Sequence, residues 1–346
     1  MAKKFDFCIG NPAYQESLED TSDKPVYNYF MDEAYKIAKK VELITPARFL
    51  FDAGKTPKAW NQKMLNDDKL KVMEYFQDSQ RVFPNNLING GVVITYRDDD
   101  KVCGKIGIFS NFEQLNHILR KVKSKFPEHG IDSIVEQQNK WNLDVLYTDH
   151  PEYRSLIGSK GREKRLTTSI FSTLSVFHEQ AENGDVGILG LIDGKRCCRF
   201  MPKKYLESNN KCLDKWKVVV ASGDGAAGTI GKPIPARVSG VPTVVEPNIG
   251  YTQTFIGFGP FNTQEEAVAA TKYLKSKFPR TMLSTLKVTQ HNHKDTWANV
   301  PLQDFTSASD IDWSCSIAEI DQQLYKKYGL TDEEIQFIET HVKEMN

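Results

Sequence analysis

The first hundred residues alternate short apolar runs with amphipathic segments, and this alternation restricts the possible folds strongly. Strands are predicted for four such runs, at residues 5–10, 41–45, 70–76 and 91–96. Tyr27, Phe30 and Ala34 recur at helical spacing and predict a helix over residues 26–40. A second helix is predicted over residues 55–66. Strands that alternate with helices favour an α/β sheet, in which we expect the first strand to be buried.

The residue composition of the sequence changes after the charged turn near residue 97. Glycines, short apolar runs and scattered basic residues become frequent, so we place a domain boundary after residue 110. The second domain, residues 111–346, is predicted to be α+β with a helical C-terminal tail. Its predicted helices cover residues 111–127, 263–278 and about 316–344.

Composition narrows the class of protein without fixing its function. The chain has 346 residues, enough for two domains, and carries 45 basic and 45 acidic residues. Zero net charge argues against a histone-like protein but leaves room for a basic face. The six cysteines form no C-x-x-C pair, which predicts no metal site. No apolar run approaches the roughly 20 residues of a membrane span, and no signal peptide is recognisable, so we expect a cytoplasmic protein without a membrane partner.

A short motif, Asn11-Pro12-Ala13-Tyr14, directly follows the first predicted strand. Open α/β sheets bind ligands in loops at the carboxyl ends of their strands. Four residues alone also fit an ordinary strand-ending turn. The surrounding segments recur in an order that resembles the adenine-N6 DNA methyltransferases of type II restriction–modification systems. These are residues 5–15, 43–50, 81–84 and 90–96 in the first domain, and residues 251–256, 273–280 and 300–305 in the second.

That family carries the motif Asn/Asp/Ser-Pro-Pro-Tyr/Phe/Trp, and Ala13 stands here in place of the second proline. The resemblance implies a partial Rossmann-like methyltransferase sheet followed by a DNA target-recognition domain. It implies that Asn11 and Pro12 accept hydrogen bonds from the adenine amine, and that Tyr14 and Phe83 stack on a base flipped out of double-stranded DNA. S-adenosylmethionine would donate the methyl group directly, without a metal.

The cofactor-binding part of this family normally precedes the Asn-Pro-Pro-Tyr motif. It uses a glycine-rich turn and an acidic residue, for which the ten residues before Asn11 leave no room. We therefore expect the cofactor-binding half to come from a companion polypeptide, or the chain to self-associate, because a sheet that lacks strands exposes an edge. The glycine-rich segment 222–232 is followed by prolines that cannot open a helix. We interpret it as a recognition-domain loop, and the cofactor-binding residues stay unknown.

DNA binding requires basic side chains on one surface. Two clusters are candidates, and each fits a solvated surface equally well: Lys160, Arg162, Lys164 and Arg165, then Lys195, Arg196 and Arg199. A third polar group over residues 287–294 is more typical of a surface turn. The alternative function is a non-enzymatic DNA-binding specificity subunit or an inactive methylase remnant. No P-D…E-x-K spacing is recognisable, so we predict that magnesium leaves plasmid DNA uncut.

Overall fold

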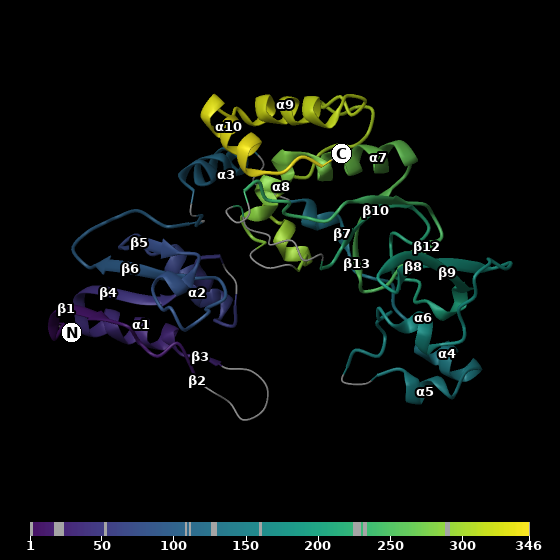
Figure 1. Ribbon diagram of the computed structural model, residues 1–346, viewed down its shortest axis with the longest axis horizontal. Coiled ribbons are helices and arrows are strands. Elements are labelled where there is room, and N and C mark those ends of the chain that lie inside the picture. Colours follow the sequence, from purple (N-terminus) through teal and green to yellow (C-terminus); the bar gives the residue numbers. More distant parts are fainter. Residues whose placement is uncertain are drawn as a thin grey trace. The chain divides into compact units, whose positions relative to one another are not determined.

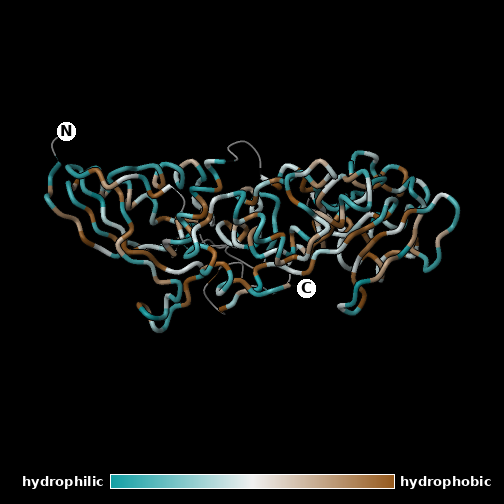
Figure 2. Tube along the Cα trace, turned by 90° about the horizontal axis from the view of Figure 1, so that it is seen from above, coloured by the Kyte–Doolittle hydropathy of each residue, from teal (hydrophilic) through white to brown (hydrophobic). Residues whose placement is uncertain are grey.

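The computed structural model describes residues 3–16, 24–51, 54–107, 109–110, 112–125, 130–158, 161–223, 230, 234–287 and 291–345. The chain divides into two compact units, Met1–Asn116 and His117–Asn346 (Figure 1). Both contain helices and sheets, so the fold is mixed α/β. Along the trace in Figure 2, apolar stretches alternate with polar stretches throughout the chain. None of the helices formed by these residues has the length and apolar character of a membrane span.

The first unit is built on a four-stranded mixed sheet in the order β1-β4-β6-β5. β1 and β4 run parallel, whereas β6 is antiparallel to both β4 and β5. The elements of this unit are β1 (Phe5–Gly10), β2 (Gln15–Glu16), β3 (Lys24–Pro25), α1 (Tyr27–Ile37), β4 (Ala38–Pro46), α2 (Lys58–Leu65), β5 (Leu70–Phe76) and β6 (Val92–Asp98).

The strand registers bring four strand ends together at one end of this sheet. Gly10 lies opposite Leu43, so β1 and β4 finish near each other. Pro46 and Phe76 both lie opposite Val92, so the ends of β4 and β5 meet the start of β6. The loop that follows β1, the loop that follows β4 and the loop between β5 and β6 therefore gather there.

The core of the first unit lies on one face of the sheet. Met31 and Ala34 of α1 pack against Val41 and Leu43 of β4, and all four side chains are buried. The predicted helix over residues 26–40 ends earlier, at Ile37, because β4 begins at Ala38 without an intervening loop. The pairing of β4 with two neighbouring strands accounts for this change of conformation.

The prediction that the first strand is buried is wrong. Phe5, Phe7 and Ile9 are 55%, 61% and 77% exposed. β1 is an edge strand whose one neighbour in the described sheet is β4, and these three side chains point away from the core, whereas Cys8 packs against it. An apolar run predicts a strand, but burial also depends on what covers the strand.

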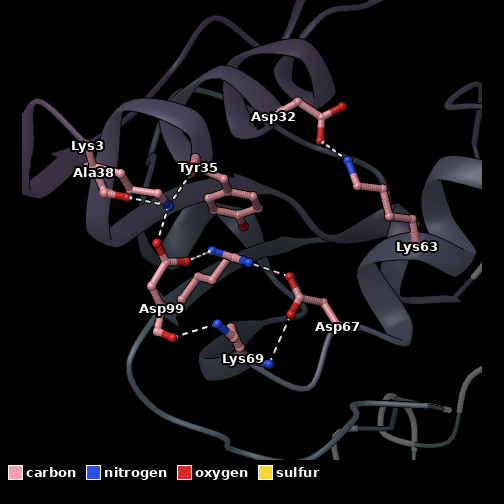
Figure 3. A network of polar contacts seen from close by, with 9 residues as sticks. Lys3, Asp32, Tyr35, Ala38, Lys63, Asp67, Lys69 and Asp99 are labelled. Atoms are coloured by element: carbon pink, nitrogen blue, oxygen red, sulfur yellow. Dashed lines mark hydrogen bonds and ion pairs between the residues drawn. The ribbon is translucent and has the colours of Figure 1, made fainter. Parts of the chain in front are cut away.

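A polar network fixes the other end of the sheet (Figure 3). The Lys3 ammonium pairs with Asp99 and donates to the carbonyl oxygens of Tyr35 and Ala38, where α1 joins β4. Arg97 pairs with both Asp67 and Asp99. These side chains are only about one-fifth exposed, so the network anchors the start of β1 to the rest of the unit.

The second unit contains two further sheets and several helices. Its four-stranded sheet has the order β11-β10-β13-β7, and its three-stranded sheet has the order β12-β8-β9. The strands are β7 (Val135–Glu136), β8 (Asp185–Ile192), β9 (Lys195–Pro202), β10 (Trp216–Ala221), β11 (Thr243–Val245), β12 (Ile249–Tyr251) and β13 (Phe255–Phe261). The helices are α3 (Glu113–Lys125, which begins in the first unit), α4 (Leu143–Asp149), α5 (Tyr153–Leu156), α6 (Ile170–Thr173), α7 (Gln264–Lys275), α8 (Lys277–Ser284), α9 (Ile317–Tyr328) and α10 (Asp332–His341).

The predicted helix over residues 263–278 is interrupted. It ends at Lys275, Ser276 is extended, and α8 begins at Lys277. The buried Asp321 carboxylate of α9 accepts hydrogen bonds from the backbone N–H groups of Lys277 and Phe278 at 2.8 and 2.9 Å. These groups have no partner within α8, so Asp321 stabilises the second helix start. The predicted tail helix is likewise two helices, because Gly329 ends α9 in the left-handed conformation.

Candidate functional site

A pocket of about 940 Å³ lies in the first unit, at the end of the sheet where β1, β4 and β5 finish. Its volume is within the range of small-molecule and cofactor sites. The wall is formed by residues 11–15, 25, 27, 46, 48, 54–56, 83 and 85–89. The pocket thus includes the whole predicted motif, Asn11 to Tyr14, together with Phe83.

The motif forms the wall that follows β1. Asn11 is exposed, whereas Pro12 and Tyr14 are half-buried. The backbone carbonyl of Tyr14 accepts a hydrogen bond from the Val26 N–H at 3.1 Å, next to the β2–β3 pairing. Burial raises the pKa of the Tyr14 phenol to about 12. Tyr14 therefore stays neutral at physiological pH and offers its ring rather than a charge.

Phe83 reaches the pocket from the loop between β5 and β6, and Ser79 organises this loop. Ser79 is buried, and its hydroxyl donates to the Asn86 carbonyl at 3.0 Å and accepts from the Ile88 N–H at 2.8 Å. The Phe83 N–H donates to the Ser79 carbonyl at 2.8 Å. The Phe83 and Tyr14 ring centroids are 6.3 Å apart, and their planes meet at 75°. The two predicted aromatic residues are therefore in edge-to-face contact in one pocket.

Arg48 also lines the pocket, although no role is predicted for it from the sequence. It follows β4 in a short 3-10 helix, Ala47–Phe51, and its Nε donates to the Asn89 carbonyl at 2.5 Å. Lys55 is the second basic side chain in the wall. The described residues of the wall include no aspartate or glutamate. The S-adenosylmethionine site of the family uses an acidic residue for the ribose, and the described wall of this pocket offers none.

Most of the glycine-rich segment 222–232, which we interpret as a recognition-domain loop, is not among the described residues. Residues 224–229 and 231–232 lie outside the described part of the chain.

The first basic cluster of the second unit is partly engaged in internal contacts. Lys164 pairs with Glu207 at 2.6 Å, whereas Arg162 and Arg165 are exposed. Lys160 lies outside the described residues. An ion pair does not prevent a lysine from binding DNA, but the pair must open first, so Arg162 and Arg165 are the more accessible members.

The second basic cluster lies on β9, which forms a hairpin with β8. Lys195 is exposed beside the hairpin turn. The Arg196 guanidinium donates hydrogen bonds to the Thr243 hydroxyl and to the Val241 carbonyl. Its central carbon lies 5.3 Å from the centroid of the Phe255 ring. Arg199 pairs with Glu179 at 2.9 Å. Two of the three cations in this cluster therefore already have partners within the protein.

Two residues of the predicted polar group 287–294 do not lie at the surface. Lys287 and Asn292 are fully buried. The Lys287 ammonium donates to the Val238 carbonyl, and the Asn292 amide donates to the Ala221 carbonyl at 2.9 Å. These two side chains hold backbone segments together and cannot reach base edges.

Comparisons with known proteins point to the same motif region. Residues 1–83 match the Eco57I restriction-modification methylase family. A protein of Mycoplasma pneumoniae named an uncharacterized adenine-specific methylase is 32% identical over 94 residues, which cover 26% of this chain and 22% of that protein. The match therefore spans about a fifth of the relative's length.

Two solved structures resemble the chain at 10% sequence identity. The type IIG restriction endonuclease BpuSI matches with a TM-score of 0.29, over 90% of this chain and 45% of its own. The type IIL restriction-modification enzyme MmeI, solved in complex with DNA, matches with a TM-score of 0.40, over 96% and 56%. The resemblance predicted from the motif is confirmed by the family match: residues 1–83 are similar to the Eco57I restriction-modification methylases.

Proposed function

We propose that this chain is the base-binding and target-recognition part of an adenine-N6 DNA methyltransferase of a restriction–modification system. One observation carries the proposal. Tyr14 and Phe83, from loops far apart in the sequence, lie in contact in one pocket that Asn11 and Pro12 also line. The family match over residues 1–83 and the relative named an adenine-specific methylase support the same reaction.

The chemistry explains why these residue types belong together. The amine of adenine is a poor nucleophile because its lone pair is delocalised into the ring. The Asn11 side-chain oxygen and the Pro12 carbonyl would accept hydrogen bonds from its two N–H groups and favour a tetrahedral nitrogen. Proline restricts its own backbone and so keeps this carbonyl directed. Ala13 lacks the restraint of a second proline, and the hydrogen bond between Tyr14 and Val26 supplies part of it.

The aromatic pair would hold the adenine ring. An aromatic side chain contributes about 1–3 kcal/mol of stacking per base. The two rings now meet at 75°, so at least one must turn for a base to stack between them. The contact between the two rings closes the space that the base would occupy. A flipped base would replace this ring contact with its own contacts to both rings.

The methyl donor would be S-adenosylmethionine, whose methyl group the amine would attack directly. Since the described wall of the pocket lacks the acidic residue that the family uses for the ribose, a companion polypeptide would supply this part of the cofactor site. The exposed edge of β1, with Phe5, Phe7 and Ile9, is suited to pair with such a polypeptide. Because β1 and β4 are parallel, a further parallel strand would extend them into a partial Rossmann-like sheet.

Double-stranded DNA would be bound by the second unit, residues 117–346, through its basic surface. Arg162, Arg165 and Lys195 are the most accessible of the predicted contacts. Such residues bind phosphates and position the protein without reading sequence.

The test is transfer of a labelled methyl group from S-adenosylmethionine to DNA, with this chain and the polypeptide encoded beside it. Asn11→Ala should lower the rate about 100- to 1,000-fold, the loss seen when a transition-state hydrogen-bond partner is removed. Asn66→Ala is the matched control, because Asn66 ends α2 outside the pocket wall. Equal rates for both variants would reject the assignment. DNA binding that S-adenosylmethionine leaves unchanged, without methyl transfer, would favour a specificity subunit or an inactive remnant.

The proposed strand pairing has its own matched pair of variants. β1 and β5 are the two edges of the described sheet, and Phe7 and Met73 are 61% and 50% exposed on them. Phe7→Ser should weaken assembly with the neighbouring polypeptide, and Met73→Ser should not. Calorimetric titration would measure this, together with S-adenosylmethionine binding before and after mixing. Binding of the cofactor to this chain alone would show that the companion is unnecessary.

A further inference from the structure

Arg48 is a cation in the pocket that neither adenine stacking nor amine binding uses. It lines the same wall as Tyr14 and Phe83. Its Nε is bonded to the Asn89 carbonyl, which leaves the two terminal Nη groups for another acceptor. The ion pairs between described residues of the first unit involve other cations, and none includes Arg48.

Two glycines hold the Arg48 stem in place. A Cβ at Gly90 would lie 2.8 Å from the Arg48 Cγ, and a Cβ at Gly54 would lie 3.2 Å from its Cδ. Both glycines have a positive φ, +90° and +92°, which other residues rarely adopt. The backbone therefore approaches the stem closely on two sides, and together with the Nε bond this fixes where the guanidinium lies.

The charge of the pocket indicates what Arg48 could bind. The described wall carries Arg48, which none of the ion pairs between described residues of the first unit includes, and no carboxylate, so it favours an anion. A guanidinium presents parallel N–H donors that match two oxygens of a phosphate. Because Nε already donates to the Asn89 carbonyl, the two terminal groups Nη1 and Nη2 are available for this contact.

We propose that Arg48 binds the phosphate group attached to the adenine nucleotide that Tyr14 and Phe83 hold, so that the pocket accepts a nucleotide and not a bare base. This inference rests on the proposed function and extends it to a phosphate subsite. Arg48 would be a positioning residue, since a phosphate contact fixes the place of the nucleotide and does not read the base.

The experiment compares adenosine with its 5′- and 3′-monophosphates by ligand-detected NMR titration into the full chain, which avoids the need to know the DNA sequence. One monophosphate should bind wild type about three- to tenfold more tightly than adenosine, as a partly exposed charged hydrogen bond allows. Arg48→Met keeps an unbranched stem and should remove this advantage without changing adenosine affinity. Arg48→Lys should keep part of it, and inorganic phosphate should compete with the monophosphate in wild type.

Arg81→Met is the matched control, because Arg81 is exposed in the same unit outside the pocket wall, near the Phe76 ring. It should keep the full preference for the monophosphate. Equal binding of adenosine and both monophosphates to wild type would overturn the proposal. So would an equal loss of affinity for all three ligands in Arg48→Met.

Failure of the proposed function would look different. If Tyr14→Ala left the binding of adenosine and both monophosphates unchanged, the adenine site itself would be misplaced. The Arg48 variants then would have no bearing on methylation.

Discussion

The pocket of the first unit and the basic segments of the second unit use polar side chains in opposite ways. In the pocket, the terminal Nη groups of Arg48 and the buried Tyr14 hydroxyl have no hydrogen-bond partner among the described residues. In the second unit, Lys164 and Arg199 form ion pairs, and the buried Lys217 donates to the Glu246 carbonyl at 2.8 Å. One region keeps binding groups available, and the other uses many of its charges for its own structure.

This difference teaches that a cluster of charges in the sequence does not predict which of its side chains the fold leaves without a partner. Residues of the pocket follow strands whose registers bring them to one end of a sheet. Basic residues within a strand, such as Arg196 on β9, meet neighbouring segments that satisfy them. The predictions below test each side of this contrast.

The largest effect should come from the backbone that supports the pocket. Gly91 has a φ of +77°, and a Cβ there would lie 2.3 Å from the Phe76 carbonyl oxygen. Gly91→Ala should lower the free energy of unfolding by about 3 kcal/mol, from strain and a backbone clash. Gly104 has a φ of +85° with no atom within 4 Å, so Gly104→Ala should lower it by about 1 kcal/mol. Urea unfolding measures both, and equal losses would refute the role of the close approach.

A smaller effect concerns a buried charge of the second unit. Burial raises the pKa of Asp321 from 3.8 to about 6. The folded state then binds a proton more tightly than the unfolded state between pH 6 and 4. The free energy of unfolding should therefore rise as pH falls through this window. Above pH 6 the cost of burying the charged carboxylate is fully present.

The variant Asp321→Asn isolates this effect because it has no group that titrates there. Relative to the variant, wild type should gain about 1–3 kcal/mol between pH 7 and pH 4. Thermal unfolding across this range measures the difference, and Asp144→Asn on the exposed surface of α4 is the control. Parallel pH profiles for wild type and Asp321→Asn would contradict the assignment.

The smallest effect should distinguish accessible from paired cations in DNA binding. Arg162→Ala should weaken binding to a DNA duplex and reduce the slope of log affinity against log salt by about one, since one phosphate contact is lost. Arg199→Ala should change the slope less, because Arg199 is paired with Glu179. Fluorescence anisotropy at several salt concentrations measures both. A larger loss of DNA affinity for Arg199→Ala than for Arg162→Ala would indicate that the DNA binds on β9.

The sequence predicts several residues that the fold brings together in the pocket wall. Asn11, Pro12 and Tyr14 were located because the motif directly follows an apolar run, and Phe83 because its segment follows in the family's order; how any of them acts stays a prediction. Arg48 lies within a segment that showed the resemblance, yet it was given no role. The signal available was its place just after the second strand, since parallel strands end at the same edge of a sheet.

Burial is what the sequence predicts poorly here. Ile9 belongs to an apolar run and is exposed, whereas Lys287 and Asn292 belong to a polar run and are buried. In each case the outcome depends on segments distant in the chain: the β1 edge that no described strand covers, and the Val238 and Ala221 carbonyls that accept from the two polar side chains. Local patterns carry no information about such partners.

The loop that Ser79 organises separates a fixed frame from a variable surface. Its shape depends on one hydroxyl and on the backbone at Gly90 and Gly91, whereas Asn85, Asn86 and Leu87 expose their side chains along the rim of the pocket. Substitutions at these three rim positions can therefore alter what touches an incoming ligand while Phe83 stays where it is. This stretch of chain is the natural place to diversify when the selectivity of the pocket is to be changed by design.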